Sequence, residues 1–342
     1  MNYNREMKTY NVIFFTYFIF CLVFLNIWGI DAIEENIDFN FFADSETYMN
    51  LYKMKLSFAE LSALNFNLLG PLFILKVLGG NYYLIFVLNM IVFYSAFKKI
   101  ITIYSMDAVK FLLLLIFSPL MIGSVIGINK EIFSFLVIAL LLQYNSTKRI
   151  KFLIWVVILS FLVRWQLCLV SLIFALATSP INPWRNRRLS TLITLILGVS
   201  IFYPLNLSSF SYVDNVATLV GEKSTEGSGL FTALIGIQNQ LFGYILVFVP
   251  KAFFLFVGLI YRINKIFDMT DLYNNFFVLS QSLFNTVLIY WTIRKKAGLR
   301  NNFVYFGVIY LVVFCISPIF APRYLFPVSI LLMCCVSERY AK

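Results

Sequence analysis

Long apolar stretches alternate with short polar breaks along the whole chain of 342 residues. The stretches are long for strands, and they lack the alternation of apolar and polar positions that marks membrane β-strands. Because backbone groups in lipid must be hydrogen-bonded within their own segment, the pattern predicts an all-α bundle of membrane helices. We predict about ten spans, at residues 10–30, 82–97, 111–128, 132–144, 152–163, 167–178, 189–205, 275–293, 303–319 and 324–336.

Two further apolar segments, 61–80 and 241–260, are each interrupted by a proline and a lysine. A crossing at 61–80 would invert everything after it, so we expect an interfacial or re-entrant helix there. Segment 241–260 fits either a re-entrant pair or two short crossings, which makes twelve spans the alternative count. The whole chain, 1–342, is expected to be one membrane domain, with outer loops at 31–67 and 206–274.

Composition and charge support a membrane location. The chain is 61% hydrophobic and only 13% charged, about half the charged fraction of a soluble domain. Its net charge of +11 comes largely from small basic clusters between the apolar runs, which indicates the positive-inside pattern rather than a nucleic-acid partner. Placing those clusters in the cytoplasm requires an even number of crossings between neighbours. Ten spans satisfy this and put both termini inside.

The acidic residues agree with that topology, although they were not used to derive it. It places 3 acidic residues inside and 13 outside. The chain has no histidine, which excludes imidazole acid–base chemistry and His-based acyl transfer. Its five cysteines lie within apolar runs without metal-type spacing. We therefore expect no metal and no cofactor.

Three turns between predicted helices carry cationic residues, and the topology puts all three on the outer side. Charged side chains beside spans cost several kcal/mol unless they snorkel, pair or face a polar cavity. They are either interface anchors and internal ion pairs, such as Lys130 with Glu131, or a shared site for an anionic ligand such as phosphate. The turns are Asn129-Lys130-Glu131, Arg164-Trp165-Gln166 and Pro322-Arg323-Tyr324.

The first outer loop supplies carboxylates. Asp44 and Glu46 stand at the start of a segment in which Asp44, Tyr48 and Tyr52 fall on one helical face. A carboxylate within hydrogen-bond reach can deprotonate a sugar hydroxyl. Alternatively, Asp44 or Ser45 caps an interfacial helix. The aromatic residues of this loop either stack on sugar rings or simply pack.

These residues resemble motifs of the GT-C class of polytopic glycosyltransferases and of the Wzy-type O-antigen polymerases of bacteria. The stretch Asp44-Ser45-Glu46-Thr47-Tyr48 is similar to the acidic loop motif of the class, Asn129-Lys130-Glu131 to its polar turn, and Arg323-Tyr324-Leu325-Phe326-Pro327 to the opening of a late helix. The likeness covers few residues, but the three motifs occur in order along nearly the whole chain.

The resemblance implies a GT-C-like bundle in a bacterial inner membrane, with the active site facing the periplasm. Asp44 would be the catalytic base, with Glu46 as its substitute. The phosphate of a polyprenyl-linked saccharide would be bound by Lys130, Arg164 and Arg323, with Glu131 positioning Lys130. Supporting roles fall to Tyr48, Gln166 and Tyr324. The partners expected are a polyprenyl-diphosphate-linked saccharide, the lipid bilayer and a polysaccharide chain-length regulator.

Three functions remain open from the sequence. The first is an O-antigen polymerase that joins polyprenyl-diphosphate-linked repeat units. The second is a single-sugar transferase that uses a polyprenyl-phosphate donor. The third is a non-enzymatic flippase or transporter for lipid-linked oligosaccharide, a class that tends to show internal repeats. Three cationic turns favour a diphosphate, and no repeat is evident in the sequence.

Overall fold

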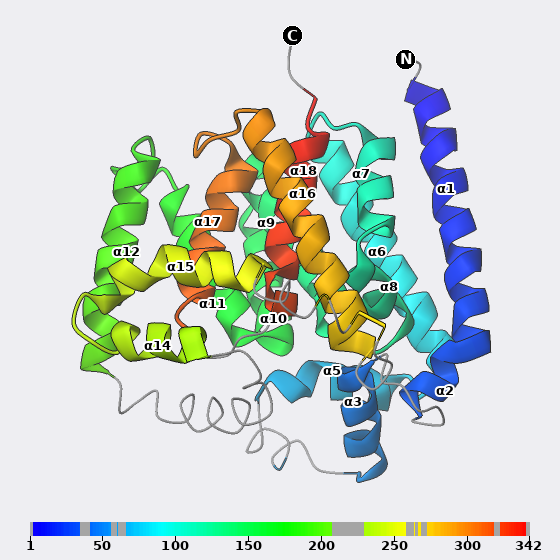
Figure 1. The fold of residues 1–342 in the computed structure, drawn as a ribbon. Helices are drawn as coiled ribbons and strands as arrows, with labels where there is room; N and C mark the ends of the chain where they lie inside the picture. The colour runs from blue at the N-terminus through cyan, green and yellow to red at the C-terminus, as the bar shows by residue number, and fades with distance from the viewer. Residues whose placement is uncertain are drawn as a thin grey trace.

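A computed structural model describes residues 3–34, 42–55, 60, 66–206, 229–257, 263, 266–267, 272–317 and 322–339 as a bundle of helices (Figure 1). The helices are α1 (Tyr3–Phe24), a π-helical turn (Leu25–Gly29), α2 (Ile30–Ile33), α3 (Ala43–Lys53), a 3₁₀ turn (Phe66–Leu68), α5 (Leu69–Val77), α6 (Tyr82–Ile103), α7 (Ala108–Ile116), α8 (Pro119–Ile126), α9 (Lys130–Thr147), α10 (Ile150–Val163), α11 (Trp165–Ala177), α12 (Arg188–Leu205), α14 (Gly229–Gln238), α15 (Gly243–Val257), a second π-helical turn, η6 (Tyr273–Val278), α16 (Leu279–Arg294), α17 (Asn302–Phe314), η7 (Pro322–Leu325, 3₁₀) and α18 (Phe326–Ser337).

Among the described residues, four continuous helical stretches are long and apolar enough to cross a membrane: Glu6–Ile33, Tyr82–Ile103, Arg188–Leu205 and Asn275–Arg294. A fifth results if the bent pair α7–α8 is one span. The remaining apolar helices, α10, α11, α15, α17 and α18, are shorter than a typical span. The all-helical class is confirmed, and the helices indicate a membrane protein. The count of ten crossings remains a prediction.

Several helices begin at the polar residues that interrupt the hydrophobic pattern. The side chains of Asn81, Asp107, Asn129 and Asn301 each accept a hydrogen bond from a backbone N–H in the first turn of α6, α7, α9 and α17, respectively. These caps satisfy N–H groups that no carbonyl of the same helix can reach. The polar breaks therefore define where the apolar segments start.

The predicted span at 111–128 is not one straight helix. The chain bends by 77° between α7 and α8, because Pro119 lacks an amide N–H and disfavours the helical conformation at Ser118. Gln281 on α16 compensates for the break. Its Oε1 accepts hydrogen bonds from Ser118 Oγ at 2.7 Å and from the Leu120 N–H at 3.3 Å.

The two termini lie at the same end of the bundle, and α3 and α5 lie at the opposite end (Figure 1). At the terminal end Arg339 pairs with Glu6 at 2.5 Å, and Lys295 Nζ donates to the carbonyl of Glu338 at 2.7 Å. Between the two ends, the core is formed by side chains of α6, α7, α9, α17 and α18 that have no exposed surface. Arg339 and Lys295 therefore lie at the end of the molecule opposite α3.

The two ambiguous segments each contain a short helix. α5 has nine residues and a length of about 13 Å, less than the thickness of a membrane. α14 and α15 pack against each other, and the buried Lys251 of α15 donates to Gln238 Oε1 at 2.6 Å and to the Ser317 carbonyl at 3.0 Å. Their placement relative to a bilayer remains a prediction. Residues 61–65 and 258–260 of these segments, and most of the expected outer loops, lie outside the described residues.

Candidate functional site

Helix α3 carries the candidate base at the end of the bundle opposite the termini. It begins after Phe42, whose side chain makes no capping hydrogen bond. Asp44 instead pairs with Arg323, and Ser45 Oγ donates to the carbonyl of Ile128 at 3.0 Å. The capping alternative is therefore not what the structure shows. α3 is held to the α8–α9 turn by Ser45, and Asp44 contacts a different part of the bundle.

Arg323 reaches Asp44 from the 3₁₀ turn that precedes α18. Its Nη1 donates to Asp44 Oδ1 at 2.9 Å, and about a quarter of each side chain is exposed (23% and 24%). Pro327 lies in the first turn of α18, where a backbone N–H would have no carbonyl partner in the helix, and proline has no N–H. The 3₁₀ turn therefore leads directly into α18. This pair joins the beginning and the end of the chain at a partly open position.

The electrostatic surroundings keep the Asp44 carboxyl ionised. Burial alone raises its pKa, but the charges of Arg323 and Lys130, the hydrogen bond from Arg323 and the charge of Arg164 outweigh burial. The resulting pKa lies below the usual value of 3.8. All three predicted cations are therefore close enough to Asp44 to act on it.

Arg164 is the residue between α10 and α11, where its extended backbone turns the chain from one helix into the next. Its Nη2 donates to Glu131 Oε1 at 2.5 Å, with 6% and 2% of the two side chains exposed. Its guanidinium also lies over the ring of Tyr324, 4.4 Å from the centroid. The arginine is thus buried and paired, an arrangement that does not provide the direct contact with substrate phosphate that the resemblance implied.

Glu131 was expected to position Lys130, but in the structure it pairs with Arg164. Successive residues of a helix point about 100° apart, so side chains at adjacent positions do not face each other. Glu131 points into the bundle, whereas Lys130 Nζ lies over the ring of Tyr48 on α3, 5.3 Å from its centroid. Lys130 is therefore held by an aromatic face rather than by a carboxylate.

Of the remaining predicted residues, Tyr324 contacts this cluster, whereas Glu46 points away from Asp44. Tyr324 contacts both Arg164 and Arg323. The Arg164 guanidinium lies 4.4 Å from the centroid of the Tyr324 ring, and the Arg323 guanidinium lies 5.5 Å from it. Gln166 is half-buried. Glu46 accepts from Asn50 Nδ2 at 3.4 Å on its own helix. Positions two apart on a helix are 200° apart, so Glu46 points away from Asp44.

The aromatic residues of the first loop mostly pack. Phe42 and Tyr48 are buried, and Tyr52 is half-buried beside Gly80, whose positive φ places it close to that ring. Phe41 lies outside the described residues. The packing alternative therefore describes Phe42 and Tyr48 better than an exposed platform for sugar rings.

Sequence reasoning missed one of the residues that fix the turn before α9. Asn89 on α6 is buried, and its Nδ2 donates to the carbonyls of Val125 and Gly127 at 2.9 and 2.8 Å. Asn129 accepts from the Glu131 N–H at 3.3 Å. A polar residue in the middle of the apolar run 82–97 was the available signal for Asn89. These bonds set the position of Lys130 and Glu131.

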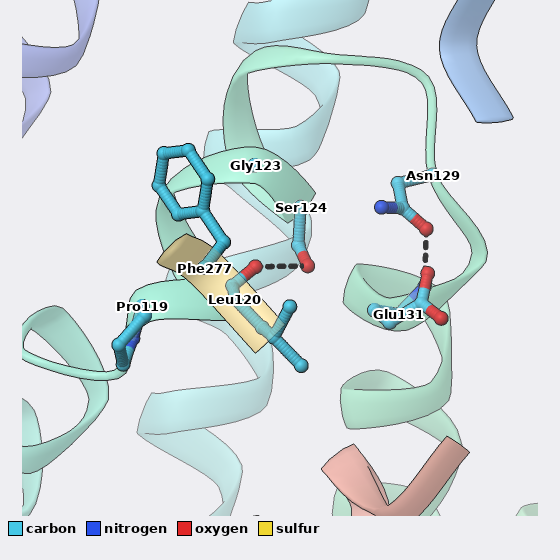
Figure 2. A pocket seen from close by; sticks show the side chains of 7 residues that line it. All are labelled: Pro119, Leu120, Gly123, Ser124, Asn129, Glu131 and Phe277. Carbon is cyan, nitrogen blue, oxygen red and sulfur yellow. Dashed lines mark hydrogen bonds between the residues drawn. The ribbon is translucent and has the colours of Figure 1, made fainter. Parts of the chain in front are cut away.

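A small cavity lies beside Glu131, lined by α8, by the start of α9 and by Phe277 (Figure 2). Its volume is about 10 Å³, roughly that of one water molecule. Glu131 Oε2 and Arg164 Nη1 are buried without a hydrogen-bond partner. The cavity is too small for a saccharide or a lipid. The part of the cluster that is partly exposed is the Asp44–Arg323 pair.

The cluster as a whole has three cations and two carboxylates, so its formal charge is +1 (Lys130, Arg164, Arg323, Asp44 and Glu131). Among the described residues, no group of three or more His, Cys, Asp or Glu side chains is arranged to hold a metal ion. Chemically, the site offers an ionised carboxylate beside excess positive charge.

Comparisons of the chain with protein-family models, with curated proteins and with solved structures give no match.

Proposed function

We propose that this chain is a bacterial surface-polysaccharide polymerase, a GT-C-like membrane glycosyltransferase that joins polyprenyl-diphosphate-linked repeat units at the outer leaflet of the inner membrane. The observation that carries the proposal is the convergence of one ionised carboxylate and three cations from α3, α9, the α10–α11 turn and η7. In this topology ten spans put both termini in the cytoplasm. The cluster then faces the periplasm.

The reaction is a direct transfer at the anomeric carbon of the donor. A hydroxyl oxygen of the acceptor sugar attacks the anomeric carbon. At the same time the bond between this carbon and the phosphate oxygen breaks, and the diphosphate leaves with the bonding electrons. The hydroxyl proton passes to Asp44. Lys130 and Arg323 stabilise the charge that develops on the departing phosphate, a preorganised electrostatic effect.

The Asp44–Arg323 pair links donor binding to the activity of the base. A phosphate competes with Asp44 for the guanidinium, whose planar fork binds phosphate oxygens well. As the phosphate draws Arg323 away, the carboxylate loses its strongest pKa-lowering partner. The basicity of Asp44 therefore rises only when the donor is bound. Without bound donor, Asp44 is a weak base and does not activate a water molecule.

Arg164 acts as a positioning residue in this mechanism. It is buried, paired with Glu131 and stacked on Tyr324, the residue next to Arg323. Its charge adds to the field at Asp44. We assign direct phosphate contact to Lys130 and Arg323.

The experiment is chain-length analysis of lipopolysaccharide in a deletion strain complemented with variants. Asp44→Asn and Arg323→Ala are expected to insert normally and to yield single-repeat products instead of a ladder. Glu46→Gln is the matched control, because Glu46 lies on the same helix but faces away, and it is expected to keep the ladder. Full ladders from both site variants would refute the assignment. Loss of the first sugar instead of the ladder would indicate a single-sugar transferase.

A transport function is separated from transfer by an assay in detergent. Purified protein with synthetic diphosphate-linked repeat units is expected to release polyprenyl diphosphate and to form longer saccharides without a membrane to cross. A flippase would give no product under these conditions. Addition of the chain-length regulator proposed as a partner is expected to change only the length distribution.

A further inference from the structure

An apolar groove on the bundle is lined by residues that do not belong to the Asp44 cluster. Helices α11 and α12 both pack against α17, and the space between them is a groove of about 690 Å³, within the range of sites for small molecules. The buried Ile309 of α17 lies at its floor, and the exposed Leu176, Trp184 and Phe202 line its sides. Figure 1 shows α12 at the edge of the bundle.

Gly198 of α12 has no side chain, and this leaves space in the groove. Gly198 lines the groove, and a Cβ at this position would meet no atom within 4 Å. A glycine inside a helix costs about 0.5–1 kcal/mol relative to alanine, so its presence needs a reason. Room for a ligand beside it provides one.

The mouth of the groove is basic. Trp184 stands in the α11–α12 connection next to Arg185, and Arg187 follows at the start of α12; both arginines are exposed. Lys148 reaches the same connection, where its Nζ donates to the carbonyl of Thr178 at 3.3 Å. Burial lowers the pKa of Lys148, and the charge of Arg185 lowers it further, which places the two cations close together.

These cations are not compensated by carboxylates. Lys148, Arg185 and Arg187 form no ion pair within the described part of the chain. Arg188 differs from them, because its guanidinium donates to the carbonyls of Leu299 and Arg300 at 2.9 and 2.8 Å. The mouth therefore combines uncompensated positive charges with an adjacent apolar groove. These two features complement the negative headgroup and the apolar acyl chains of an anionic phospholipid.

We propose that the α11–α12 groove binds one anionic phospholipid, with an acyl chain along Gly198 and the headgroup phosphate between Lys148, Arg185 and Arg187. The predicted topology places this mouth at the cytoplasmic leaflet, where basic residues near the membrane surface attract anionic lipids. The site is independent of the proposed glycosyl transfer. It is assigned by shape and charge alone.

Trp184 is a reporter within the site. In a protein where Trp28, Trp155, Trp165 and Trp291 are replaced by phenylalanine, the remaining emission comes from the groove. The protein is reconstituted in phosphatidylcholine vesicles that contain a small fraction of brominated phosphatidylglycerol or, separately, of brominated phosphatidylcholine. Bromine quenches tryptophan only on close approach. Phosphatidylglycerol is expected to quench severalfold more effectively, and high salt is expected to reduce the difference.

Two variants and one matched control separate shape from charge. Arg185→Gln with Arg187→Gln is expected to abolish the preference for phosphatidylglycerol, and both residues are exposed, so folding is not at risk. Gly198→Phe fills the groove and is expected to lower quenching by both lipids. Gly236→Phe is the control, because Gly236 on α14 also has open space around it but lies outside the groove.

Equal quenching by the two lipids would overturn the proposal. So would a preference for phosphatidylglycerol that survives removal of both arginines. A third contrary result is a Trp184 shielded from both lipids because a second copy of the chain covers the groove.

Discussion

Asp44 and Arg323 are 279 positions apart in the chain, yet they form an ion pair at 2.9 Å at one end of the bundle. Only about a quarter of each side chain is exposed. The pair is therefore neither fully exposed nor sealed inside the bundle, and it lies beside Lys130, which lowers the pKa of Asp44 together with Arg323. We propose that this partly open position serves binding and transfer.

The first prediction separates a structural pair from a functional one. Asp44→Asn and Arg323→Gln are each expected to reduce transfer by at least tenfold with little change in the amount of inserted protein. The swapped variant, Asp44→Arg with Arg323→Asp, restores the pair with reversed orientation. It is expected to insert as well as the wild type but not to recover transfer, because the base and the phosphate ligand have exchanged places. Activity of the swapped variant close to wild type would show that the pair serves only to hold α3.

The second prediction concerns pH. The pKa of Asp44 lies below 3.8, so the carboxylate stays ionised as the pH falls from 7 to about 4, and its contribution is lost only as the pH falls through this depressed value. Arg323→Gln removes the largest influence that lowers the pKa, while burial continues to raise it. The acidic limb of the pH profile of kcat/KM reports the enzyme without bound donor, so it is expected to move to higher pH in this variant. Glu46→Gln is expected to leave the limb in place, and an unmoved limb in Arg323→Gln would contradict the role of Asp44 as base.

The third prediction concerns the buried pair of Glu131 and Arg164. Removal of one partner leaves an uncompensated charge in the bundle, at a cost of about 3–5 kcal/mol. Glu131→Gln and Arg164→Met are each expected to lower the unfolding temperature in detergent by several degrees, and the double variant is expected to recover part of the loss. The reactivity of the buried cysteines with a fluorescent maleimide reports unfolding directly. If the double variant is less stable than either single variant, the pair is not the source of the effect.

The sequence predicts which charges gather more reliably than it predicts which charges pair. Hydropathy and the basic clusters placed Asp44, Lys130, Arg164 and Arg323 on one side, and the structure brings them together at one end of the bundle. The side on which a turn lies follows from whether an even or odd number of crossings precedes it. That count needs only the direction of each segment and no knowledge of how the helices pack.

The partners could not be predicted, because they depend on how each helix is rotated about its axis. Packing sets that rotation, and it turned Glu131 toward Arg164 and left Lys130 on Tyr48. The bend at Pro119 was also missed, since a proline near the middle of an apolar run is compatible with a continuous span when neighbouring helices satisfy the freed groups. Here Gln281 provides that compensation at a bend instead.

The last prediction tests whether the α8–α9 turn positions the base. Gly127 has an extended backbone that any residue can adopt, but a Cβ there would overlap Ser45 Oγ on α3. Gly127→Ala is therefore expected to push α3 outward. This movement displaces Asp44, because Asp44 directly precedes Ser45 on the same helix. A displacement of about 1 Å can reduce a rate by about a hundredfold. Transfer by Gly127→Ala is measured with purified protein and synthetic donor.

Gly298→Ala is the control, because a Cβ at Gly298 would meet no atom within 4 Å, and this variant is expected to keep full activity. Ser45→Ala removes the overlapping oxygen, so the double variant Gly127→Ala with Ser45→Ala is expected to recover much of the lost rate, even though it lacks the hydrogen bond to Ile128. Recovery follows only if the position of α3 is what the turn controls. Should Gly127→Ala transfer at the wild-type rate, α3 does not need the turn to present Asp44, and the ion pair with Arg323 alone must hold the carboxylate in place.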